Sequence, residues 1–168
     1  VTNHFPLIET SVSTRLEMCL LANLNSMVLD YVVRQKIGGV TLNFFIVEQL
    51  PILSPETYSE RCPWAKKLSL EQWICERVLR LSCTSEDLMP LAQATTFDPP
   101  IRKWNPAERA LLCSELDAAF LVLYGIKETE LKTIFRAFGM DATQSNDLFN
   151  SPCHPAMILD AYERFRQK

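Results

Sequence analysis

The sequence predicts a mainly α protein (α+β with one small β element) that ends in a helical, bundle-like C-terminal lobe. Two observations predict this class. Apolar residues recur every three or four positions over several segments, as along one face of an α-helix, and residues that start and end helices flank those segments. Only residues 40–53 are rich in β-branched and aromatic types, which is typical of a strand.

The first predicted helix covers residues 14–37. Thr14 and Glu17 have the spacing of a capping box, in which a hydroxyl and a carboxylate accept hydrogen bonds from free N–H groups of the first turn. Gly38 and Gly39 follow the helix. Glycine enters the left-handed conformation of a helix end without strain, so this pair is expected to end the helix.

The β-branched segment contains Pro51, which cannot donate a ladder hydrogen bond, so any strand there is expected to be short and at an edge. Residues 54–67 are polar, contain two further prolines and indicate a connector. Ser69 starts a second capping box, and Asn105 precedes Pro106 as an N-cap. Helices are therefore predicted at about 69–81, 85–94, 105–124 and 128–138, and from Pro155 onward.

Composition narrows the class of protein. The chain of 168 residues is 48% hydrophobic and 22% charged, with a formal net charge of -3, which excludes a disordered tail and argues against a strong non-specific nucleic-acid binder. The longest apolar stretch, near residues 118–124, is far shorter than the ~20 residues of a membrane helix. None of the six cysteines forms a Cys-x-x-Cys pair, so reduced, buried thiols in a cytoplasmic protein are expected.

No sequence motif of a known catalytic site stands out. The adjacent Cys153 and His154 have no second pair of ligands at zinc-site spacing, so a loop cap is the expected role of this pair. Asp117, Glu130 and Lys132 superficially match the acidic pattern of metal-dependent nucleases. Both halves of that pattern lie in helical sequence, so these residues are expected to be solvent-facing charges on helices. A nuclease is a further, less favoured hypothesis.

A more informative set of residues follows the first helix. Two cations, two glycines, a hydroxyl and an amide stand within ten residues, at Arg34, Lys36, Gly38, Gly39, Thr41 and Asn43. Such a set can contact phosphates, because glycine lets the backbone approach closely and arginine donates a fork of hydrogen bonds. It also suits an ordinary helix end, where cations offset the helix dipole. Phe44 and Phe45 are expected in the core rather than as base-stacking platforms.

Several motifs resemble the C-terminal part of large bacterial adenine-N6 DNA methyltransferases, which include fused restriction–modification enzymes and related phage-defence proteins. The first group comprises Leu20–Ser26, Asp30–Tyr31, Arg34–Lys36, Gly38–Gly39, Leu42–Phe45 and Gln49–Pro51. The second comprises Arg77–Leu81 with Thr84 and Asp87–Leu88, and Glu115–Ala119 with Leu123–Gly125. Together they cover roughly residues 20–125 in the order of the family.

The resemblance implies the end of a DNA target-recognition region at residues 1–58 and a helical C-terminal lobe at 59–168. The family's Asn/Asp-Pro-Pro-Tyr/Phe motif and its glycine-rich loop for S-adenosylmethionine are missing from this sequence, so the resemblance places them upstream. The expected role is therefore non-catalytic, without a cofactor of its own. Cys113 and Ser114 also depart from the family, which has Arg-Ala there.

The implied partners are double-stranded DNA and the upstream methyltransferase domain of the same chain. The residues expected to face DNA are the six at the helix exit: Arg34, Lys36, Gly38, Gly39, Thr41 and Asn43. The alternative is a helical interaction or structural module that packs on the methyltransferase domain or a partner subunit without touching DNA. The acidic balance and the amphipathic helices favour that alternative.

Overall fold

The computed structural model describes residues 8–39, 41–95, 103–140 and 155–167, and within them it is mainly helical. The helices in chain order are α1 (Thr14–Leu24), α2 (Met27–Lys36), α3 (Phe44–Val47), α4 (Pro55–Ser59), α5 (Leu70–Ser82), the 3-10 helix η1 (Glu86–Leu88), α6 (Met89–Ala94), α7 (Pro106–Leu123), α8 (Glu128–Ala137) and α9 (Pro155–Arg166). This confirms the mainly α class.

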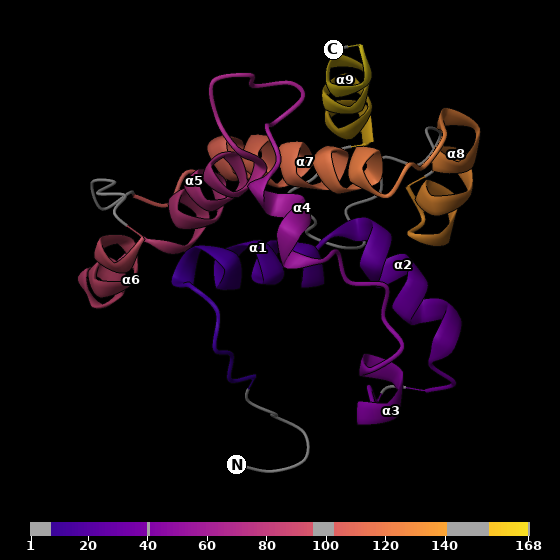
Figure 1. Cartoon of the computed structure of the whole chain (residues 1–168). Coiled ribbons are helices and arrows are strands. Elements are labelled where there is room, and N and C mark those ends of the chain that lie inside the picture. The colour runs from indigo at the N-terminus through magenta and orange to yellow at the C-terminus, as the bar shows by residue number, and fades with distance from the viewer. Residues whose placement is uncertain (1–7, 40, 96–102, 141–154, 168) are drawn as a thin grey trace.

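The core lies around α7, which runs through the middle of the molecule and has α9 packed against it (Figure 1). Consecutive α7 residues, Ala118 to Leu121, are all fully buried, so this helix is covered on every side rather than along one stripe. On the other side of α7 lies α2, while α1 packs against α5. The division into two regions, at residues 1–58 and 59–168, stays a prediction. Helix α1 of the first region packs against α5 of the second.

Local capping signals predicted two helix starts correctly. Ser69 accepts a hydrogen bond from the Gln72 backbone N–H at 3.1 Å, and Gln72 Oε1 accepts one from the Ser69 N–H at 3.0 Å, which completes the capping box of α5. At α7, Asn105 Oδ1 accepts from the backbone N–H groups of Ala107 and Glu108. Both caps are contained within four consecutive residues, so the sequence carries the whole signal.

The predicted single helix over residues 14–37 is wrong, because it breaks at Asn25 and Ser26 into α1 and α2, which are bent by 59°. Polar side chains at the break bond backbone carbonyls in the last turn of α1. The Asn25 amide donates to the Leu21 carbonyl at 2.8 Å, and the Ser26 hydroxyl donates to the Asn23 carbonyl at 2.7 Å. The first turn of α1 is capped by Ser13 rather than Thr14.

The predicted β element is also wrong within the part of 40–53 that the structure describes, which excludes Val40. The described chain forms no strand, and its one isolated bridge joins Arg61 and Ser69. The apolar run instead forms the short helix α3, in which the Ile46 and Val47 N–H groups donate to the Asn43 carbonyl. A strand needs a partner edge, and the described residues offer none to this segment.

Gly38 and Gly39 end α2 without the left-handed conformation that was expected there. Ile37 leaves the helix in an extended conformation, with φ -88° and ψ 130°. The glycines with positive φ are Gly125 (68°) and Gly139 (67°), which follow α7 and α8. Ser85 likewise begins the 3-10 helix η1 without a side-chain cap, whereas an α-helix capped by Ser85 was expected.

None of the described helices is by itself long and apolar enough to cross a membrane. The bent pair α1 and α2 meets the length and composition requirement only when both helices are taken together.

Candidate nucleic-acid interface

The end of α2, the chain after it and α3 form one side of the molecule, and we call residues 34–39 and 41–49 the α2–α3 surface. In Figure 1, α3 projects from the body of the protein near the last turn of α2. All six residues that the sequence predicts to face DNA lie on this surface and are solvent-exposed: Arg34, Lys36, Gly38, Gly39, Thr41 and Asn43. The structure thus places the predicted set on one segment and open to solvent.

Lys36 connects α2 to α3 through a chain of hydrogen bonds. Its ammonium donates to Gln49 Oε1 at 3.4 Å, and Gln49 Nε2 donates to the Phe45 carbonyl at 2.9 Å. Lys36 forms no ion pair with any carboxylate in the part of the chain that the structure describes. Its charge is therefore held beside α3 and is not neutralised by an acidic side chain.

Arg34 is arranged differently from Lys36. Its guanidinium donates to both carboxylate oxygens of Asp30, at 3.0 and 3.1 Å, and lies 4.7 Å from the ring centroid of Phe138. The Asp30 carboxylate offsets the charge that was predicted to meet phosphate, and the cation–π contact draws the side chain toward α8. The two predicted cations consequently face different neighbours and do not form one cluster.

The two glycines leave the backbone open at the exit of α2. No heavy atom would lie within 4 Å of a Cβ placed at Gly38 or Gly39, and neither residue has positive φ. Nothing in the described protein therefore requires glycine at these positions. The lack of a side chain at Gly38 and Gly39 would matter only to a molecule that approaches the backbone from outside.

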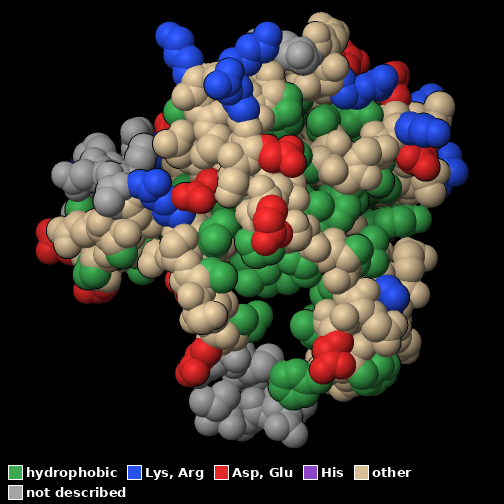
Figure 2. Space-filling model, viewed as in Figure 1, with side chains coloured by type: hydrophobic (Ala, Val, Ile, Leu, Met, Phe, Trp, Pro, Cys, Tyr) green, Lys and Arg blue, Asp and Glu red, His purple; other side chains and the backbone are tan. Residues whose placement is uncertain are grey.

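The expectation that Phe44 and Phe45 lie in the core is wrong. Their exposed fractions are 66% and 60%, and Leu42 beside them is 46% exposed. Figure 2 shows hydrophobic side chains at the surface over α3. Ile46 is the buried residue of this helix. Sequence analysis missed this patch because a four-residue helix can bury only one of its faces, and the run was interpreted as a strand.

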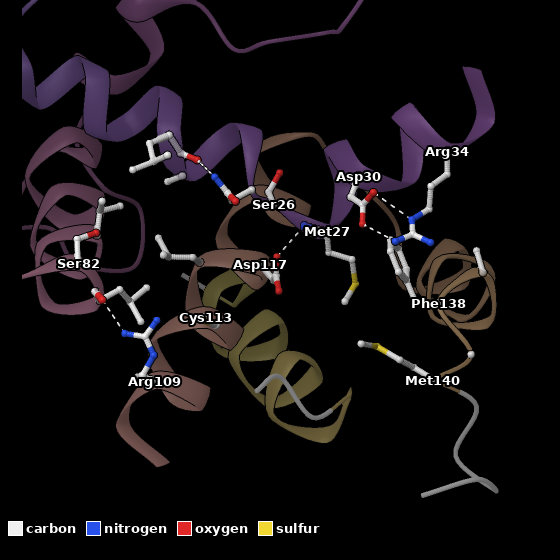
Figure 3. A pocket seen from close by; sticks show the side chains of 18 residues that line it. Ser26, Met27, Asp30, Arg34, Ser82, Arg109, Cys113, Asp117, Phe138 and Met140 are labelled. Carbon is white, nitrogen blue, oxygen red and sulfur yellow. Dashed lines mark hydrogen bonds and ion pairs between the residues drawn. The ribbon is translucent and has the colours of Figure 1, made fainter. Parts of the chain in front are cut away.

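A groove lies between the bent pair α1–α2 and the helices α5, α7 and α8, with a cavity volume of about 760 Å³ (Figure 3). Apolar side chains line most of it, including Met27, Leu116, Phe138 and Met140. The Asp30–Arg34 pair lies at one side, and the labelled Arg109 lies at the other. Apolar walls with a few polar groups are typical of binding sites, and no sequence motif predicted this one.

The acidic residues of the nuclease pattern are engaged in helix caps. Asp117 Oδ1 accepts from the Met27 backbone N–H at 2.7 Å, which caps α2 from α7 (Figure 3). Glu130 Oε2 accepts from the Lys127 N–H at 2.7 Å at the start of α8. Among the described residues, no three His, Cys, Asp or Glu side chains are grouped so as to hold a metal ion. Cys153 and His154 lie outside the described residues.

We expect Asp117→Ala to lower the free energy of unfolding by about 1–2 kcal/mol, because the first turn of α2 loses its capping acceptor. Urea denaturation measures the change. Asp117→Asn is the matched control, since its carbonyl oxygen can still accept the Met27 N–H, and it should lose clearly less stability. Equal stability of Asp117→Ala and the natural sequence would contradict the assignment of this cap.

Comparison with protein-family models, curated proteins and solved structures finds no match to this chain.

Proposed function

We propose that this chain is a non-catalytic part of an adenine-specific DNA methyltransferase and helps to hold duplex DNA through the α2–α3 surface. The methyl transfer and the binding of S-adenosylmethionine belong to an upstream domain of the parent protein. A methyltransferase reaches its target atom only after the base leaves the stack, so the duplex must be held in place on either side. The present chain supplies part of the contacts that keep the duplex in place.

Two arguments support the proposal. The resemblance to the family spans most of the chain, and its helix-exit motif is the segment that makes up the α2–α3 surface. The observation that most supports the proposal is that all six predicted residues are exposed. Lys36 is held toward α3 and forms no ion pair within the described chain. Residues 34–54 carry two cations and one carboxylate, Glu48, although the chain as a whole is acidic. Contact with phosphate is therefore favoured on this segment.

Lys36→Gln in the full-length protein is expected to weaken binding to all duplex sequences alike, because a phosphate contact carries no base information. The slope of log K against log salt should fall by about one. Fluorescence anisotropy of a labelled duplex over a range of salt concentrations measures both. Lys67→Gln is the matched control, since Lys67 is exposed in the connector before α5. If Lys36→Gln, alone or with Arg34→Ala, left affinity and salt slope unchanged, this placement of DNA would be wrong.

The parent enzyme is tested separately by the reading frame upstream of Val1. An Asn-Pro-Pro-Tyr-like motif after a glycine-rich strand–turn–helix is the expected finding, because these elements bind the adenine and S-adenosylmethionine in the family that the chain resembles. A start codon immediately before Val1 would contradict the proposed methyltransferase parent.

The second candidate function is an interaction module, which the groove of Figure 3 favours. An apolar groove of this size suits a helix of the methyltransferase domain or of a partner subunit. Met27→Glu would place a charge on its wall. If the groove is the functional surface, that variant should release the partner while leaving DNA affinity unchanged. Hydrogen exchange of α7 and α8 in the parent protein, compared with the isolated chain, shows whether the groove is covered.

A further inference from the structure

The most exposed apolar residues of the α2–α3 surface have no role in the function proposed above. Phe44 and Phe45 expose 66% and 60% of their surface although each could contribute by burial to the stability of the fold. Adjacent apolar side chains at the surface of a protein usually mark a place that another molecule covers. The geometry of the two rings indicates which kind of molecule can cover them.

The shape of α3 favours insertion over flat docking. Successive side chains of a helix point about 100° apart, so Phe44 and Phe45 present two different faces of α3. Both are exposed on α3, which projects from the body of the protein (Figure 1), whereas Ile46 is buried. A flat partner could cover only one of these two faces. Two stacked flat layers can cover both faces when the side chains lie in the narrow space between the layers.

The position of α3 is held by polar contacts that also place a cation beside it. Gln49 Nε2 binds the Phe45 carbonyl at 2.9 Å, and Lys36 binds Gln49 from the end of α2. The ammonium of Lys36 is complementary to phosphate, and phosphates flank every base step of DNA. Aromatic rings stack on bases of any sequence, and apolar wedges inserted between base steps occur together with such basic contacts.

We propose that Phe44 and Phe45 form an apolar wedge that enters the base stack of the bound duplex at the position from which the adenine leaves. The inference rests on the proposed function and assigns to α3 the task of unstacking DNA, whereas Lys36 holds the phosphate. The wedge fills the space that the departing base vacates. It thereby lowers the free energy of the unstacked duplex relative to the stacked one.

The test compares two duplexes that differ only in one abasic site, because unstacking at such a site is already complete. The full-length protein should bind the abasic duplex about tenfold more tightly or better than the paired duplex, a ratio that corresponds to about 1.4 kcal/mol. Phe44→Ala with Phe45→Ala should bind both duplexes with the same affinity. Leu42→Ala is the matched control, since Leu42 is an exposed apolar residue of the same segment, and it should keep the preference.

The outcomes separate the wedge from the proposed function. If the phenylalanine variant keeps the preference, or the natural protein has none while it still binds DNA through Lys36, the wedge is wrong and the DNA-holding function stands. If the protein binds neither duplex, both are wrong. If hydrogen exchange of the methyltransferase domain changes in the phenylalanine variant while its affinity for both duplexes is unchanged, a protein surface covers these side chains and the wedge is wrong. Thermal unfolding confirms that each variant folds, as expected for exposed positions.

Discussion

Asn23→Ala is expected to lower the free energy of unfolding by about 3 kcal/mol, because one buried amide joins three parts of the fold. Asn23 Oδ1 accepts from the Leu53 N–H at 3.1 Å and from the Tyr58 hydroxyl at 3.3 Å. Asn23 Nδ2 donates to the Tyr124 hydroxyl at 2.9 Å, which itself donates to the Pro51 carbonyl at 2.7 Å. Removing the amide leaves buried polar groups without their partner, and each costs about 1–3 kcal/mol.

Chemical denaturation of the variant measures this loss. Asn25→Ala is the matched control, because Asn25 is exposed and bonds only the Leu21 carbonyl of its own helix. We expect that variant to lose less than about 1 kcal/mol. Similar losses in the two variants would show that the Asn23 network does not hold α1, α4 and α7 together.

The second large effect is a loss of stability at alkaline pH. Burial raises the pKa of four thiols above the ordinary value of 9.0, and these belong to Cys19, Cys62, Cys75 and Cys83. Burial also raises the pKa of Tyr58 and Tyr124 above 10.0. The folded state therefore binds protons that the unfolded state releases, so the stabilisation is complete below about pH 9 and is lost as pH rises. A thiol that stays protonated in the folded state and ionises in the unfolded state contributes a slope of at most about 1.4 kcal/mol per pH unit.

Urea denaturation at a series of pH values above neutrality measures this slope. Cys19→Ala removes one of the titrating groups, so its stability should decline less steeply with pH, despite a loss of about 1 kcal/mol at neutral pH from the smaller side chain. Thiolate absorbance in the ultraviolet should appear together with unfolding. Cys113 and Cys153 are replaced by serine for this measurement, because they do not belong to the buried set of four. Thiolate formation in that variant while it stays folded just above pH 9 would contradict the burial of the four thiols.

The fold was predictable where its signals are local. The caps at Ser69 and Asn105 each lie within four residues, and both helices begin as predicted. The break between α1 and α2 was not predictable in the same way, since Asp117, which caps α2, is 90 residues away in sequence. The β-branched run failed as a strand because strand formation depends on a partner edge, which composition does not reveal.

The candidate site was predictable in part. The helix exit indicated six residues, and the structure exposes all of them. The pairing of Arg34 with Asp30 follows the four-residue spacing of helical ion pairs, which is a signal that the sequence contains. The exposure of Phe44 and Phe45 was not predictable, because whether an apolar run is buried depends on what packs over it. The groove is formed by five helices from distant segments and has no local signal.

Photocrosslinking tests most directly whether the α2–α3 surface faces DNA. A photoreactive amino acid is placed at Thr41 in the full-length protein, with Glu163 on the exposed side of α9 as the matched control position. On irradiation with duplex DNA, we expect crosslinks to DNA from position 41 and none from position 163. Crosslinks from position 41 to protein alone would contradict the account and favour the interaction module.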